Sequence, residues 1–413
     1  MKLTVTQKRQ RIRMMASGVL VMFFTGVTHI WSIFQPYVME QAGWTQGQAS
    51  LCFYLAFATF VFGNIIGGRI QDKKSPRLVV FIGGALFTVG TILSAFLIIP
   101  SPIPIYLTYG VIQGFGQGMI YTTIISTAQK WFPKRTGFAS GIVVTANGLC
   151  GFFVSPVSRM LLQKIGPSGT FLVIGSVIGI SWILSSIFFR VPDEEWRKQM
   201  EHDAAQQDGN AAAAAGKQYT SGEMMHTKRF YFLFLAMLFG LVPYFMISPV
   251  SQTHQMSLGI SANVAVSAVM IGSIVNASTR LVLPTLADKV GRVVCIKAAL
   301  LISTAAMVVL ALTSSYAVTV AIVIIYGCYG GIMGSFPSFT SSIFGIKHSG
   351  ENYGYVMFGI VIVTLGVPIL TEFITGSGFQ MQMVFAVGAV FAMMSFVCLN
   401  VLEKELKRIS AKR

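Results

Sequence analysis

Long apolar stretches alternate with short polar segments along the whole chain. Several of these stretches exceed the roughly 18 residues that a helix needs to cross a bilayer. Some contain glycine and proline, which transmembrane helices tolerate better than soluble helices do. Twelve spans are predicted, at residues 14–38, 46–69, 78–99, 104–129, 138–162, 168–190, 230–252, 262–285, 293–313, 317–341, 353–375 and 380–402. The pattern therefore predicts an all-α membrane protein with twelve transmembrane helices.

Composition supports a membrane protein and changes the interpretation of its charge. The chain is 54% hydrophobic and only 11% charged, whereas a soluble protein has about 25% charged residues. A net charge of +16 is in principle compatible with binding nucleic acid. The basic residues lie in the connecting segments, however, as the positive-inside rule describes. We therefore expect the lipid bilayer, and no nucleic acid, as the large-scale partner.

The basic residues also orient the predicted spans. Of the 30 Lys and Arg residues, all but Arg159, Lys164 and Arg280 fall in the N-terminus, the even-to-odd loops and the C-terminus, or at their edges. Both termini are therefore expected to be cytoplasmic. The apolar run after the basic N-terminus continues past Trp31 without a clear cleavage site, which favours a retained first helix over a signal peptide. The five cysteines show no metal-ligand spacing, so we expect neither a metal nor a cofactor.

A long polar stretch in the middle of the chain divides it into two sets of six spans. Within it, Thr220 and Glu223 have the spacing of a capping box, and the part rich in Gln, Asp, Gly, Asn and Ala reads as a flexible linker. The predicted organisation is a cytoplasmic tail (1–13), a six-helix bundle (14–190), a cytoplasmic central loop (191–228), a second six-helix bundle (229–403) and a cytoplasmic tail (404–413).

A short charged motif follows span two and recurs after span eight, as expected of an internal repeat. The two copies read GGRIQDKKSPR and PTLADKVGR. They resemble the loop signature of the major facilitator transporters, although neither copy is complete. The charged residues of the motif are Asp72, Lys73, Arg77, Asp288, Lys289 and Arg292. We expect these groups to pair with one another and with helix termini in one conformation and to separate in another.

Arg280 is the strongest candidate for a binding residue. It precedes Asp288 by eight positions, so about 12 Å of helix separates it from the cytoplasmic end. A lone cation at that depth costs at least about 2.5–3.5 kcal/mol, and the only acids outside the loops, Glu40 and Glu372, lie near the external face. An unpaired Arg facing a cavity suits a carboxylate; bonding to backbone carbonyls or helix ends is the alternative. The first-half equivalent is Asn64, so the expected site is asymmetric.

Four other residues are candidate neighbours of Arg280. Asn276 lies one helical turn away on the same face. Tyr121 and Tyr329 occupy glycine-rich segments in spans four and ten, where small residues allow helices to approach closely. Gln117 is the first-half equivalent of Tyr329. Each tyrosine can either donate a hydrogen bond to the substrate or serve only in packing.

His29 and Asn147 complete the candidate set. His29 is the only histidine deep in a predicted span. It can serve as a substrate donor, a proton carrier or a neutral histidine of the core. Asn147 in span five is a weaker cavity candidate. No nucleophile–base arrangement, metal cluster or phosphate-binding loop is present, so an enzyme is not expected and transport would be secondary.

The chain resembles the oxalate/formate antiporter family of bacterial major facilitators. The resemblance covers nearly the whole chain apart from the termini and the central linker. It is carried by WSIFQPYV (31–38), GGRIQDKKSPR (67–77), QKWFPKRTGFASG (129–141), SGEMMHTKRFYFL (221–233), ADKVGR (287–292) and FPSFTSSIFGIKHSGENYGYV (336–356). It implies a major facilitator fold, a bacterial cytoplasmic (inner) membrane location and a small carboxylate substrate. We expect a monomer, because the fold does not require a partner subunit.

The family's oxalate carrier is described as binding its dicarboxylate with an Arg in span eight and a Lys in span eleven, among aromatic residues. Arg280 matches that Arg, and Tyr121 matches a cavity tyrosine, but the Lys position falls on Ile360. Tyr329 and Met357 stand where the oxalate carrier has tryptophans, and His29 falls near a tyrosine position.

A dianion facing one Arg would keep about one uncompensated charge, at a cost of several kcal/mol. The resemblance therefore favours a monocarboxylate carrier of the lactate, pyruvate or formate class, coupled to protons or working by exchange. An oxalate/formate-type antiporter is the alternative. A carboxylate sensor that signals through loop 191–228 is a third hypothesis, and the unpaired Arg280 argues against a neutral-solute or drug carrier.

Overall fold

The computed structural model describes residues 5–189, 191–192 and 218–411, and every regular element in them is helical. The first helix set comprises α1 (Val5–Thr25), η1 (Gly26–Ile30), α2 (Trp31–Ala42), α3 (Gln46–Lys73), α4 (Pro76–Ser94), α5 (Ile103–Ile105), η2 (Tyr106–Gln113), α6 (Gly114–Trp131), η3 (Pro133–Arg135) and α7 (Thr136–Ser186). The second helix set comprises α9 (Ser221–Met225), α10 (Lys228–Ile247), η5 (Ser248–Val250), α11 (Ser251–Ser257), α12 (Ala262–Val290), α13 (Arg292–Leu312), α14 (Ala317–Phe344), α15 (Ser349–Met357), α16 (Gly359–Gly376) and α17 (Met381–Ala411).

Ten helical segments in the described part of the chain are long and apolar enough to cross a membrane. Among the predicted spans, only those that correspond to α6 and α12 lie outside these ten. Both are nevertheless long helices, of 18 and 29 residues. The structure therefore confirms an all-helical membrane-type fold, while the count of twelve crossings stays a prediction.

Several predicted spans are interrupted rather than straight. Span one contains a 3₁₀ segment, η1, and span four begins with the π-helical segment η2. Spans five and six form α7, which reverses direction at Gly166 with a φ of +68° that favours glycine. The predicted capping box at Thr220 and Glu223 is present, but it starts the short helix α9 instead of a membrane span. Most of the predicted loop 191–228 lies outside the described residues.

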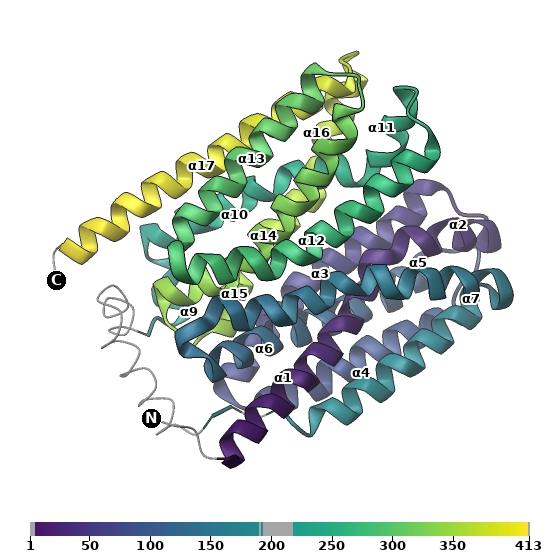
Figure 1. The fold of residues 1–413 in the computed structure, drawn as a ribbon. Helices are drawn as coiled ribbons and strands as arrows, with labels where there is room; N and C mark the ends of the chain where they lie inside the picture. Colours follow the sequence, from purple (N-terminus) through teal and green to yellow (C-terminus); the bar gives the residue numbers. More distant parts are fainter. Residues whose placement is uncertain (1–4, 190, 193–217, 412–413) are drawn as a thin grey trace.

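The two helix sets lie side by side. Figure 1 shows the purple-to-teal helices of the first set grouped against the green-to-yellow helices of the second. Glycines allow the sets to touch: a Cβ on Gly68 of α3 would lie 2.3 Å from the Gly350 backbone of α15. A Cβ on Gly148 of α7 would lie 3.2 Å from Ala277 of α12. Close contact through small residues is the usual way in which membrane helices pack.

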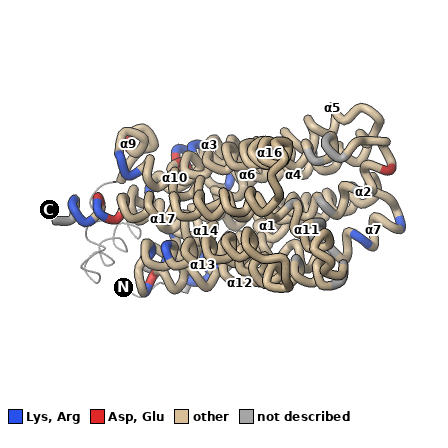
Figure 2. Tube along the Cα trace, turned by 90° about the horizontal axis from the view of Figure 1, so that it is seen from above, with Lys and Arg blue, Asp and Glu red and all other residues tan. Residues whose placement is uncertain are grey.

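Charge is concentrated at one end of the molecule. Figure 2 shows most Lys and Arg residues at the end that carries both termini, with few at the opposite end. This arrangement fits the orientation predicted from the loops, in which the end with the termini is cytoplasmic. The orientation itself stays a prediction, since no membrane is part of the structure.

Candidate functional site

A small cavity surrounds Arg280 between the two helix sets. Its volume is about 20 Å³, enough for about one water molecule. It is lined by His29, Phe57, Phe60, Gln117, Tyr121, Asn147, Arg280, Tyr329, Met333 and Ile360. The cavity therefore gathers six of the seven substrate-binding candidates, and Asn276, the seventh, contacts Arg280 directly.

Close packing of α14 against α12 fixes the position of Arg280. A Cβ on Gly330 would lie 2.1 Å from the Asn276 carbonyl oxygen, and one on Gly334 would lie 2.4 Å from the Arg280 carbonyl oxygen. The Thr279 hydroxyl also donates to the Gly327 carbonyl at 2.7 Å. The glycine-rich segment of α14 therefore holds the α12 backbone in place, and the Arg280 side chain, only 4% exposed, enters the protein interior.

The Arg280 guanidinium is held by neutral oxygen atoms. Its Nε donates to Asn276 Oδ1 at 2.8 Å and its Nη1 donates to Asn147 Oδ1 at 2.9 Å. A weaker contact of 3.5 Å joins Nη1 to the Val144 carbonyl. Among the described residues, no carboxylate hydrogen-bonds to the guanidinium, and Nη2 has no hydrogen-bond partner. The site therefore combines a full positive charge with an edge that is available for an anion.

Aromatic rings surround the cation. The Arg280 Cζ atom lies 5.8 Å from the Tyr329 ring centroid, within the range of a cation–π contact. Tyr329 in turn stacks on Tyr244 of α10, with ring centroids 3.7 Å apart. On the other side of the cavity, the Tyr121 ring meets Phe60 edge-on at 5.2 Å. These apolar walls lower the local dielectric constant and so strengthen electrostatic contacts inside the cavity.

Two tyrosine hydroxyls near Arg280 are buried without a partner. Tyr121 and Tyr353 are 3% and 2% exposed, and neither hydroxyl has a hydrogen-bond partner among the described residues. Both lie within electrostatic range of Arg280. Such groups are uncommon, because an unsatisfied buried hydroxyl is unfavourable. Tyr353 was not among the site residues predicted from the sequence.

A chain of hydrogen bonds connects Asn147 and Gln117 to α1 and η1. Asn147 Nδ2 donates to Thr25 Oγ1 at 3.0 Å, and Gln117 Nε2 donates to the Thr25 carbonyl at 2.6 Å. Thr28 Oγ1 donates to Gln117 Oε1 and accepts from Gln113 Nε2, both at 2.8 Å. Both amide side chains are therefore fixed in orientation.

His29 lies in η1 and lines the same cavity. Its ring is 5.2 Å from the Phe57 ring, and it interacts with Asn147 and lies within electrostatic range of Arg280. The position therefore suits contact with a substrate held by Arg280.

The two aspartates of the repeated charged motif occupy equivalent positions. Asp72 accepts from Lys130 Nζ at 2.8 Å and from the Glu351 backbone N–H at 3.2 Å, in the first turn of α15. Asp288 accepts from the backbone N–H groups of Gly137 and Phe138, at 3.3 and 3.0 Å, in the first turn of α7. Each carboxylate therefore interacts with the positive end of a helix from the opposite helix set.

The cations of the motif differ in whether they form an ion pair. Arg292 donates to Asp288 at 2.8 Å and to Thr136 at 3.1 Å. Lys73, Arg77 and Lys289 are exposed and form no ion pair with a described residue. Polar contacts between the described residues of the two helix sets lie at Arg280 or toward the end with the termini, so this end is closed.

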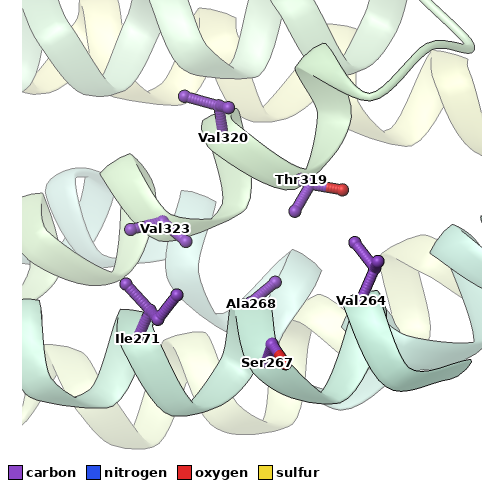
Figure 3. Close-up of a pocket in the computed structure, with 7 residues that line it drawn as sticks. All are labelled: Val264, Ser267, Ala268, Ile271, Thr319, Val320 and Val323. Carbon is purple, nitrogen blue, oxygen red and sulfur yellow. The ribbon is translucent and has the colours of Figure 1, made fainter.

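A second cavity lies away from Arg280. It is an apolar groove of about 380 Å³ between α12 and α14, shown in Figure 3. Its lining includes Ile271 and Val320, which are 52% and 59% exposed. Exposed aliphatic side chains on a membrane helix are expected to face lipid acyl chains. Apart from the hydroxyls of Ser267 and Thr319 the lining of this groove is aliphatic, and it contains no charged side chain that could hold an anion.

The family model described as Major Facilitator Superfamily matches residues 16–362. The chain therefore belongs to the major facilitator superfamily, and it is a transporter rather than an enzyme. Solved structures of this superfamily share its fold. The transporter FucP in its outward conformation has a TM-score of 0.72 over 95% of this chain and 99% of its own, at 14% identity. The proton:xylose symporter XylE has a TM-score of 0.69 over 95% of both chains, at 14% identity.

Two relatives are named for the carboxylates that they carry. An oxalate:formate antiporter of Oxalobacter formigenes is 25% identical over 386 residues, which covers 92% of this chain and 89% of the relative. Human monocarboxylate transporter 11 is 28% identical over 123 residues, or 30% of this chain and 26% of the relative. The expected resemblance to the oxalate/formate antiporter family is confirmed.

Proposed function

We propose that this protein is a secondary transporter of a small organic monocarboxylate of the lactate, pyruvate or formate class. The observation that carries the proposal is the charge of the cavity. Arg280 supplies one positive charge, and Ile360 also lines the cavity without adding another. One guanidinium compensates one carboxylate, whereas a dianion would keep a charge in a cavity with aromatic walls.

The remaining cavity groups fit a small acid. The unbonded edge of Arg280 and the hydroxyl of Tyr121, which lines the cavity without a partner among the described residues, supply donors for the carboxylate and for a neighbouring oxygen. His29 lies close enough to contact the same substrate or to carry a coupled proton. The cavity of about 20 Å³ is the size of about one water molecule, so it must widen to admit even a small acid.

Alternating access would use the charged contacts at the end with the termini. Asp72 and Asp288 bind the first turns of α15 and α7, and these contacts must break for that end to open. We infer that they stabilise the conformation closed at this end, with both termini in the cytoplasm and the bundle in a bacterial inner membrane.

Counterflow into proteoliposomes tests the proposal. Vesicles loaded with unlabelled lactate, pyruvate or formate should accumulate the labelled acid, and oxalate should compete weakly. Robust counterflow of oxalate without any of the three monocarboxylates would refute it. Oxalate:formate antiport is the second candidate, because the relative from Oxalobacter formigenes covers most of the chain.

A further inference from the structure

Asn147 links Arg280 to the opposite helix set. Arg280 lies on α12, and its Nη1 donates to Asn147 Oδ1 on α7 at 2.9 Å. Gly148, the next residue, favours this close approach, because a Cβ there would lie 3.2 Å from Ala277 Cα, a tight contact. The α7 backbone therefore approaches the α12 backbone at the level of the guanidinium.

A hydrogen bond from the Asn147 amide nitrogen to α1 fixes the orientation of the amide. Its Nδ2 donates to Thr25 Oγ1 at 3.0 Å, and Thr25 Oγ1 donates in turn to the Met22 carbonyl at 2.6 Å. Because the amide nitrogen is committed to α1, the amide oxygen must face Arg280. Asn276 approaches the guanidinium from its own helix in the same way, with Nδ2 donating to the Tyr326 carbonyl at 3.0 Å. Two amide oxygens of fixed orientation therefore accept hydrogen bonds from the guanidinium.

An amide oxygen binds the guanidinium of Arg280 without neutralising its charge. It accepts a charged hydrogen bond and so offsets part of the desolvation of the guanidinium, but it leaves the positive charge in place. A carboxylate at the same position would neutralise Arg280 and compete with an anionic substrate. With Ile360 at the cavity wall, no second cation repels Arg280 when the helix sets close around it.

We propose that Asn147 acts as a stand-in ligand of Arg280, which lets the carrier change conformation without substrate and therefore carry out net transport as well as exchange. This inference rests on the proposed function, since it requires a monocarboxylate that Arg280 binds. Asn147 is thus a positioning residue for the return of the empty carrier. A carrier whose buried cation lacked such a ligand would close only around its anion and would be confined to exchange.

Two transport protocols on the same proteoliposomes separate the two steps. Counterflow of labelled lactate against internal lactate requires only the loaded carrier. Uptake into vesicles without internal anion, with the membrane potential clamped, also requires the empty carrier to return. We expect the wild type to perform both, and Asn147→Ala to lose about ten- to hundredfold in uptake, the effect of one charged hydrogen bond. Because Asn147 also lines the cavity, counterflow should fall as well, but by clearly less than uptake does.

Asn64→Ala is a matched control, because Asn64 is a buried asparagine whose amide donates to the Phe60 carbonyl and not to Arg280. Any effect of this variant should be equal in the two protocols. Equal losses in both protocols for Asn147→Ala would overturn the proposal.

The wild type alone also tests the proposal, even if the variant does not fold. Counterflow without uptake into anion-free vesicles would overturn the stand-in role while leaving the substrate class intact. Absence of every monocarboxylate flux in both protocols would instead refute the proposed function.

Discussion

Replacing Ile360 by lysine should convert the cavity from one that suits a monoanion to one that accepts a dianion. Ile360 is 2% exposed and lines the cavity with Arg280. A lysine there would place a second positive charge within the same enclosure. At an effective dielectric constant near 20, a carboxylate about 4 Å from that charge would gain about 4 kcal/mol.

Part of this gain is lost, because burying the ammonium group also removes it from water. A net gain of about 1.5–3 kcal/mol for the second carboxylate of oxalate corresponds to about ten- to hundredfold in its preference over lactate. The assay is competition of oxalate with labelled lactate in counterflow, expressed as the ratio of the two inhibition constants.

Ile360→Met is the matched control, since it introduces an unbranched side chain without a charge. We expect its oxalate-to-lactate ratio to equal that of the wild type. The charge-count reasoning fails if Ile360→Lys, shown to be folded by thermal unfolding, leaves the ratio unchanged. It also fails if Ile360→Met changes the ratio as much as the lysine does.

Four further variants probe other parts of the structure. Tyr121→Phe and Tyr353→Phe each remove a buried hydroxyl that lacks a partner among the described residues. Each variant should raise the KM for lactate about three- to tenfold if the hydroxyl donates to substrate. An unchanged KM with a higher Tm would mean a packing role. Lys130→Met leaves the 1% exposed Asp72 carboxylate without its cation and should cost about 3–5 kcal/mol of stability; a melting temperature equal to that of the wild type would contradict this. Gly68→Val should block closure of the end with the termini, because even a Cβ there would lie 2.3 Å from the Gly350 backbone of α15. A cysteine introduced in the cavity should then be labelled more readily from that side. Unchanged labelling would contradict this prediction.

The sequence predicted the helical membrane fold well, because apolar length alone decides which segments can span a bilayer. It also predicted the break between spans five and six, since Gly166 lies between the predicted spans 138–162 and 168–190. It did not predict the 3₁₀ segment η1 within span one or the π-helical segment η2 at the start of span four. Hydropathy does not report such local changes of helix type, since they barely alter the apolar pattern.

The site could be predicted in part for a similar reason. Arg280 stood out because a cation in an apolar helix is costly wherever that helix packs. Asn276 followed from helical spacing alone. Tyr353, Val144 and Lys130 were not predicted, because their roles depend on which faces of separate helices meet. Val144 contributes a backbone carbonyl, which no side-chain pattern can reveal.

The central claim is that Arg280 binds the carboxylate of the substrate, and Arg280→Ala tests it most directly. Lactate counterflow should fall at least about thirtyfold, since truncating one partner of a buried charge pair costs about 2–5 kcal/mol. Arg280→Lys should retain part of the activity, because it keeps the charge and loses the planar fork. Arg159→Ala, at the opposite end of the molecule from the termini, should transport like the wild type. Counterflow retained at wild-type level by a folded, membrane-inserted Arg280→Ala protein would contradict the account.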